Sequence, residues 1–308
     1  MLHEYAVEPH AIGSDWQTFR YLIEKFGFDR GRLISEFPKR WFGEVYRAST
    51  GFTNVQRTYL VEVLAQAKRN KVVRFGRPYD PNLGGWIDNA LAQHANAPFQ
   101  AIIAEANPAE EDAVLAASEV NELHPLMISP HTWLVRRVGS VLADAMGPML
   151  RCARTLLLVD RFFDISDARY QETLKACLDV VRSSGGNCVR CEIHFCDDDR
   201  RPSIDFIERN AHRWLRGVIP VGMSIALFAW HEKDMGEDFH ARYLLTDVGG
   251  ITVDAGFSAE GDHQKVQLAL LPSDLVQTKL EAFGRGASVY DLVEPVLEVG
   301  ADGTVRRV

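Results

Sequence analysis

The sequence has no long apolar run. None of its hydrophobic stretches approaches the roughly 20 residues that cross a bilayer. Residues Met1 to Tyr5 lack the basic segment and following apolar segment of a secretory signal. We therefore expect no membrane span and a cytoplasmic location. Cysteine is also scarce, and five cysteines are an odd number that fits reduced thiols better than a disulfide framework.

An excess of positive charge is absent as well. The chain has 34 Lys and Arg against 42 Asp and Glu, a formal net charge of −8 at pH 7. Proteins that coat nucleic acid or anionic membranes gain affinity from clustered Lys and Arg, so bulk coating of that kind is not indicated. A local basic groove is still compatible with the composition. Its candidates, which in most proteins would be solvated surface, are Lys39 and Arg40, Arg136 and Arg137, Arg200 and Arg201, and Arg209 with Arg213 and Arg216.

Four potential metal ligands cluster at Cys188, Cys191, His194 and Cys196. A zinc site needs its ligands to converge on one point. On the strand predicted from Val189 to Cys196, side-chain alternation places Cys191 on the face opposite to His194 and Cys196. The pattern therefore argues against zinc, and we interpret the cysteines as small buried residues.

The first part of the chain shows mainly helical patterns. Ser14 and Asp15 form a capping signal before apolar residues at helical spacing. Further helices are predicted over residues 54–69, 87–93 and 110–122, and a strand only over residues 71–75. We expect residues 1–125 to form a mainly helical N-terminal domain of unknown role. The boundary is placed near residues 123–131, where two prolines interrupt regular structure.

The second part alternates strands and helices. After an amphipathic stretch over residues 133–154, which we predict to be helical, strands are expected at 155–160, 189–196, 224–230 and 265–271. Helices are expected at 168–182, 202–216 and 273–283. Continuous apolar strands of this kind are typical of a sheet covered by helices on both faces. Residues 126–308 are therefore predicted to form an α/β domain.

One segment of this domain carries a chemical motif. His240, Arg242 and Asp247 form the pattern His-x-Arg-x4-Asp. On an extended strand His240 and Arg242 would lie on the same face, which places an imidazole beside a permanent, phosphate-binding cation. Residues 247–250 indicate a turn and residues 251–255 a returning strand, so we predict a hairpin with its polar groups near one end.

A second formal match to the motif comprises His231, Lys233 and Asp238. Its surroundings are acidic and lack apolar alternation. We discount it because this spacing alone is a weak signal.

The segment around His240 resembles the signature of the phospholipase D superfamily, His-x-Lys-x4-Asp followed by a Gly-Ser-rich strand. It is most similar to the variant with Arg in place of Lys, found in modules C-terminal to MIT domains and in bacterial proteins. The resemblance implies an α/β sandwich with a mixed sheet over the C-terminal domain. It also implies that His240 attacks phosphorus, that Arg242 binds phosphoryl oxygens, and that Asp247 supports the fold and the imidazole. No metal or other cofactor is implied. Two departures are Arg242 itself and the strand Gly256-Phe-Ser258, which lacks the family's Asn.

Other residues are expected to support this site. Ligands of open α/β sheets gather at the carboxyl ends of strands, which nominates Asp160, Arg161 and the acidic loop at residues 197–199. Lys265 would add a second cation. Gly256 and Ser258, the counterparts of the family's Gly-Ser pair, complete the predicted phosphate-binding set.

Two functions of different classes follow. The first is a metal-independent phosphodiesterase, a bacterial nuclease of a defence system that acts on DNA or RNA. Because active members of the superfamily combine two such motifs and this chain has one convincing copy, a homodimer pairing two His240 side chains is expected. The second is a catalytically inactive module that binds phosphate groups of nucleic acid or lipid headgroups, or a partner protein from the same operon.

Overall fold

The computed structural model describes residues 2–185, 188–198 and 201–308. The chain divides into two compact units, Met1–His131 and Thr132–Val308. Both units are α/β.

A sheet of five parallel strands forms the centre of the N-terminal unit, in the order β3-β2-β1-β4-β5. The strands are β1 (His3–Val7), β2 (Arg32–Ser35), β3 (Val72–Val73), β4 (Ala101–Ala104) and β5 (Val114–Ala116). The helices are α1 (Pro9–Gly13), α2 (Trp16–Glu24), α3 (Trp41–Ala48), α4 (Asn54–Asn70) and α5 (Trp86–Asn96). The expectation of a mainly helical domain was therefore wrong about the architecture of this unit, although α2, α4 and α5 lie where helices were predicted.

β3 lies within the strand predicted over residues 71–75, but the other four strands were missed because they are short and largely buried. All four residues of β2 and of β4 are buried, so neither strand shows the alternation that identifies a half-buried strand. The helix predicted over residues 110–122 was wrong for a related reason. In that segment β5 pairs with β4, and only a short 3-10 helix, Ala117–Glu119, follows.

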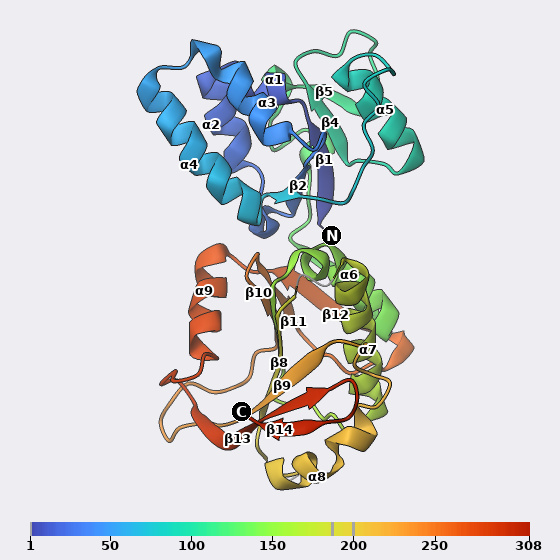
Figure 1. The fold of residues 1–308 in the computed structure, drawn as a ribbon, viewed down its shortest axis with the longest axis vertical. Coiled ribbons are helices and arrows are strands. Elements are labelled where there is room, and N and C mark those ends of the chain that lie inside the picture. Colours follow the sequence, from blue (N-terminus) through green and yellow to red (C-terminus); the bar gives the residue numbers. More distant parts are fainter. Residues whose placement is uncertain (1, 186–187, 199–200) are drawn as a thin grey trace. The chain divides into compact units, whose positions relative to one another are not determined.

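Alternate residues of this sheet pack against helices on opposite sides. Tyr5, Val7 and Ile103 belong to a core shared with α2, α3 and α4. Ala6 and Ile102 belong to a second core shared with α5. Figure 1 shows α2, α3 and α4 on one side of the strands and α5 on the other.

A nine-stranded mixed sheet forms the centre of the C-terminal unit, in the order β14-β13-β9-β8-β7-β10-β11-β12-β6. The strands are β6 (Thr132–Arg137), β7 (Thr155–Val159), β8 (Arg190–Cys196), β9 (Ser224–His231), β10 (Tyr243–Thr246), β11 (Gly250–Val253), β12 (Gly261–Leu270), β13 (Asp291–Gly300) and β14 (Val305–Arg307). The helices are α6 (Gly139–Cys152), α7 (Ala168–Ser183), α8 (Ile204–Trp214) and α9 (Ser273–Ala282). The predicted α/β class with a mixed sheet is confirmed.

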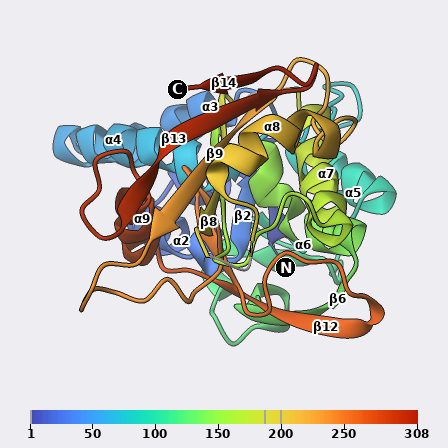
Figure 2. The ribbon, with the colours of Figure 1, turned by 90° about the horizontal axis from the view of Figure 1, so that it is seen from below.

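Helices cover both faces of this sheet. Phe228 and Trp230 on one face pack with Val276 and Phe283 in the core beneath α9. Figure 2 shows α9 on one side of the strands and α6, α7 and α8 on the other. One predicted helix was partly wrong, because the amphipathic stretch from residue 133 begins with β6, which pairs with β12, before α6 starts.

Strand directions define two edges of this sheet. β7, β8 and β9 are parallel, and β10 is antiparallel to β7. The carboxyl ends of β7, β8 and β9 therefore lie in one row with the beginning of β10. We call this row of strand ends the site edge. The amino ends of the three parallel strands lie at the opposite edge, together with the turn between β10 and β11.

Among the described residues, no helix combines the length and the apolar character needed to cross a membrane.

Candidate functional site

His240 and Arg242 lie at the site edge, in the loop that leads into β10. The expectation that they occupy a strand was wrong, because β10 begins at Tyr243. Tyr243 pairs with Val159, the last residue of β7, so the residues before Tyr243 have no strand beside them on that side. One backbone hydrogen bond, from Val253 N to Arg242 O at 2.9 Å, still ties the loop to β11. The predicted β10–β11 hairpin is present.

Asp160 is a buried carboxylate that holds this loop in place. Its side chain has no solvent exposure, and it accepts hydrogen bonds from the backbone N–H groups of Phe162, at 2.8 Å, and Phe257, at 3.1 Å. Nε of Arg242 lies 3.4 Å from its Oδ1. Burial raises the pKa of Asp160, while the two N–H groups and the charge of Arg242 act in the opposite direction. The buried carboxylate of Asp160 therefore orients the guanidinium of Arg242.

Gly256 is required by the position of Asp160. Its φ angle is 78°, a left-handed conformation that favours glycine. A Cβ atom at this position would lie 2.3 Å from Oδ2 of Asp160 and 2.9 Å from Cδ of Arg242. The glycine predicted to bind phosphate thus has a definite structural role, which is to leave room for the Asp160–Arg242 pair.

Three guanidinium groups gather around Phe162. The Cζ atoms of Arg161, Arg201 and Arg242 lie 5.2, 4.8 and 5.1 Å from the centre of its ring. They come from the end of β7, from the segment before α8, and from the loop before β10. Arg201 also donates a hydrogen bond to the carbonyl oxygen of Arg161. Guanidinium groups gathered around one side chain provide forked N–H donors, which phosphate oxygens accept.

Arg201 was missed as a site residue. In the sequence it was one of several candidate surface pairs, 40 residues beyond Arg161. The sequence offered one signal for Arg201, which is a basic residue in the segment that follows β8. The carboxyl end of β8 lies at the same edge of the sheet as Asp160 and Arg161.

His240 stands beside this cluster and is open to solvent. Its side chain is 72% exposed. Nδ1 lies 2.9 Å from Nη1 of Arg161, and because a guanidinium can only donate, Nδ1 is the acceptor and carries a lone pair. Nε2 lies 3.5 Å from Oδ2 of Asp238. The lone pair of the imidazole therefore points to the guanidinium that would hold an anion.

Glu232 anchors the loop that carries His240. Its Oε1 accepts hydrogen bonds from Nη1 of Arg161, at 3.2 Å, and from the backbone N–H of Phe239, at 2.7 Å.

The neighbouring His231 ends β9, and its Nε2 lies 2.9 Å from Oδ2 of Asp197. Part of the discounted second motif thus contributes to the site edge. Asp199, the last residue of the nominated acidic loop, lies outside the described residues, as does Arg200.

Asp247 is not part of this cluster. It follows β10 and lies at the opposite edge, where its Oδ1 accepts hydrogen bonds from the backbone N–H groups of Arg154, at 2.7 Å, and Thr155, at 3.0 Å. These bonds tie the β10–β11 turn to the start of β7. Asp247 is placed to support the fold and not to orient His240.

We expect Asp247→Ala to lower stability and leave ligand affinity nearly unchanged. The variant removes two exposed hydrogen bonds, each worth about 0.5–1.5 kcal/mol, so the free energy of unfolding should fall by about 1–3 kcal/mol. Urea unfolding measures this loss, and Asp179→Ala on the exposed face of α7 is the control. A variant of wild-type stability would contradict the assigned role.

The two remaining predicted residues differ in placement. Ser258 is buried and accepts a hydrogen bond from Nη2 of Arg137, which also donates to the carbonyl oxygen of Ala255 at 3.1 Å. Ser258 thereby fixes the segment after Gly256. Lys265 is exposed on β12, opposite Arg136. Among the described residues, no hydrogen bond or ion pair joins Lys265 to His240 or Arg242.

The cysteines and the histidine near β8 that were considered as zinc ligands have different contacts. Sγ of Cys188 and Sγ of Cys191 lie 3.4 Å apart. His194 is fully buried, with Nε2 3.1 Å from Oε2 of Glu192 and Nδ1 accepting a hydrogen bond from Nε1 of Trp230 at 3.0 Å. Burial lowers the pKa of His194, so its neutral form is favoured. In the described parts of the chain, no three His, Cys, Asp or Glu side chains are grouped to hold a metal ion.

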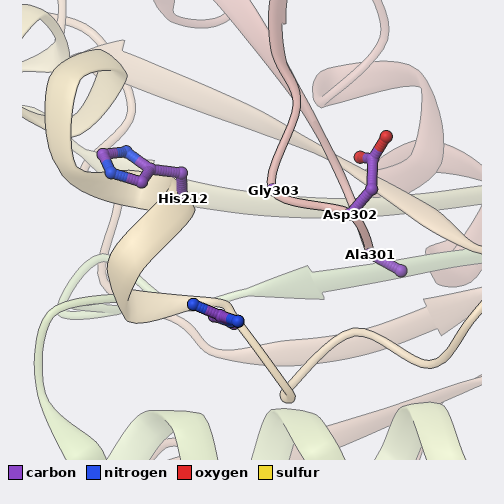
Figure 3. Close-up of a pocket in the computed structure, with 5 residues that line it drawn as sticks. His212, Ala301, Asp302 and Gly303 are labelled. Atoms are coloured by element: carbon purple, nitrogen blue, oxygen red, sulfur yellow. The ribbon is translucent and has the colours of Figure 1, made fainter.

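A hollow of about 430 Å³ lies at the other edge of the sheet. It is lined by His212, Arg216, Ala301, Asp302 and Gly303. Gly300 pairs with Ser224, the first residue of β9, so the turn at residues 301–303 lies near the amino end of that strand. Figure 3 shows the His212 and Asp302 side chains apart from each other and on different elements. This hollow is therefore separate from the His240 cluster.

Comparisons with known proteins leave the family open. No protein-family model matches the sequence, and no curated protein matches it. Among solved structures, the chain has a likeness to TrmBL2, an archaeal chromatin protein whose structure shows a novel mode of DNA binding. The two are 16% identical, with a TM-score of 0.29, over 53% of this chain and 55% of that chain. The compared region thus spans about half of each chain, and a likeness this low supports no argument about fold or function.

Proposed function

We propose that this chain is a metal-independent phosphodiesterase of the phospholipase D type, a nuclease that acts through His240 in a homodimer. The observation that carries the proposal is the exposed imidazole of His240, 2.9 Å from a guanidinium that belongs to a group of three. Nucleophile and anion-binding groups at one place are what phosphoryl transfer requires.

The reaction has two steps. A ring nitrogen of His240 attacks phosphorus, the bond to the leaving ester oxygen breaks, and that oxygen takes a proton from the His240 of the second subunit. Water then attacks the phosphohistidine, the second imidazole takes its proton, and the phosphorus–nitrogen bond breaks to free His240. The arginines stabilise the negative charge on the phosphoryl oxygens in both steps.

The alternative is a non-catalytic module that binds phosphate groups. It is favoured by the contacts of Arg242, whose Nη1 donates to Asp254 O at 2.5 Å while its Nε faces Asp160. In this alternative Arg161 and Arg201 hold the anion, and the ligand is nucleic acid, a lipid headgroup or a phosphorylated partner.

The test is an assay in EDTA with plasmid, single-stranded DNA, RNA and bis(p-nitrophenyl) phosphate, together with sedimentation to measure oligomeric state. Cleavage by a dimer supports the enzyme. Binding without cleavage supports the module, and a monomer without cleavage overturns the proposed dimeric mechanism.

We expect Arg201→Ala to weaken binding of the phosphodiester by about tenfold, because it removes a charge-assisted contact. The matched control is Arg182→Ala, at the exposed end of α7 near the opposite edge. Titration by fluorescence anisotropy with a labelled single strand measures both. Equal losses in the two variants would show a general charge effect and would contradict a site at Arg201.

A further inference from the structure

The order of the strands in the N-terminal unit creates a crevice. From β1 the chain proceeds to β2 and β3 on one side of the sheet, then returns to β4 and β5 on the other side of β1. In open parallel sheets, ligands bind outside the carboxyl ends of the two strands where the order reverses, which here are β1 and β4.

A cavity of about 360 Å³ lies at this place. Its lining includes Glu8 and His10, directly after β1, together with Glu44, Arg47, Tyr79 and Trp86. The volume falls in the range of small-molecule sites. Glu44 and Arg47 belong to α3, and Trp86 begins α5, so the walls come from helices on both faces of the sheet.

The base of the cavity is fixed by bonds between β1 and β4. The backbone N–H of Glu8 donates to Ile103 O at 2.8 Å, and the backbone N–H of Glu105 donates to Oε2 of Glu8 at 2.7 Å. Nδ1 of His10 lies 3.1 Å from Oε2 of Glu105. A site whose groups are already held loses little conformational entropy when a ligand binds.

The charges around the cavity disfavour a phosphorylated ligand. Among the lining side chains, Glu8 and Glu44 carry two carboxylates and Arg47 carries one guanidinium, which lies 3.7 Å from Glu44. His10, also in the lining, is paired with Glu105, which is not part of the lining. The turn after β1 has no glycine-rich sequence, and Pro9 at the start of α1 has no N–H to offer. Nucleotide phosphates in the usual position for such sheets would meet carboxylates instead of donors.

The same groups suit an organic cation. Carboxylates attract an amine or amidinium, and the half-buried rings of Tyr79 and Trp86 provide aromatic surface for its charge and for a flat apolar body. Burial raises the pKa of Tyr79, and the charges of Glu44, Asp88 and Glu8 raise it further, in agreement with a negative potential at this wall.

We propose that the cavity at the β1–β4 crevice is a binding site for a small organic cation that carries an amine or amidinium on a flat body. The N-terminal unit is then a ligand-binding module with a specificity separate from that of the His240 cluster.

Three isosteric probes test this site by calorimetry on the full chain. They are benzamidine, which is cationic, benzamide, which is neutral, and benzoate, which is anionic. We expect benzamidine to bind and the other two to bind at least tenfold more weakly, in line with loss of about one desolvated charge interaction. Equal binding of benzamide or benzoate, or no heat with benzamidine up to about 10 mM, overturns the proposal, since fragments of this size bind in the millimolar range.

Variants locate the binding. Glu44→Gln keeps the shape of the side chain and is expected to weaken benzamidine at least about fivefold. The control is Glu62→Gln on the exposed face of α4. If both variants bind benzamidine as the wild type does, the cation lies elsewhere and the proposed site is wrong. Circular dichroism confirms that each variant is folded, and the three-probe comparison stands without any variant.

Discussion

His240→Ala is expected to abolish cleavage of a phosphodiester in EDTA, with a rate reduced at least about 10³-fold, because loss of a covalent nucleophile removes the entire two-step route. The side chain is exposed and makes one ionic contact at 3.5 Å and one hydrogen bond to Arg161, so its removal leaves the fold intact. Binding of uncleaved substrate should persist, because the three arginines remain.

The matched control is His212→Ala, an exposed histidine on α8 at the opposite edge of the same sheet. Initial rates with bis(p-nitrophenyl) phosphate, measured for both variants at equal protein concentration, separate the outcomes. Cleavage that survives in His240→Ala refutes the phosphohistidine. Cleavage lost in His212→Ala as well would assign the effect to folding or to a contaminant.

Gly256→Ala is expected to lower the free energy of unfolding by about 2–4 kcal/mol, the sum of left-handed backbone strain and a steric collision. The collision involves the buried carboxylate of Asp160, 2.3 Å from the new Cβ. Since Asp160 cannot move without losing its bonds to Phe162 N and Phe257 N, Arg242 is displaced as well. We therefore expect weaker phosphate binding together with lower stability.

Gly222→Ala is the control for this variant. Gly222 has a φ of 84°, close to that of Gly256, but a Cβ there would meet no atom within 4 Å. Its unfolding free energy should fall by about 1 kcal/mol, from backbone strain alone. Equal losses for the two glycines, measured by urea unfolding, would show that Asp160 does not constrain Gly256.

How far the sequence predicted the fold depended on how each element is stabilised. α2 was predicted from a local signal, the capping residue Asp15, whose side chain accepts from Thr18 N. α4 was predicted as well, and its start is also stabilised locally, by the reciprocal bonds of Thr53 and Gln56. The strands of the N-terminal sheet are stabilised by partners far away in the chain. β4, for example, pairs with β1, almost 100 residues earlier, and its four buried residues carry no periodic pattern.

The predicted site likewise contains residues that the sequence identified and residues whose positions depend on distant parts of the chain. Asp160, Arg161, His240, Arg242 and Gly256 were named from a motif and from the rule on strand ends, and the structure brings them together. Glu232 was not named, and Arg201 was named only as one of several candidates for a basic groove, because their places depend on where β8 and β9 end relative to β7. The family resemblance implied that Asp247 supports both the fold and the imidazole, but its hydrogen bonds to Arg154 N and Thr155 N place it at the opposite edge of the sheet from His240.

The contacts at the two ends of β10 have a consequence for its alignment. At one end Arg242 is bound to Asp160, and at the other end Asp247 is bound to the backbone at Arg154 and Thr155. A slip of β10 by two residues would preserve which side chains face the core, so apolar packing alone does not forbid it. Such a slip would break both contacts at once. The spacing of the motif therefore fixes the register of β10 against β7, because Arg242 and Asp247 are bound at opposite ends of the strand. This role of the motif does not depend on catalysis by His240.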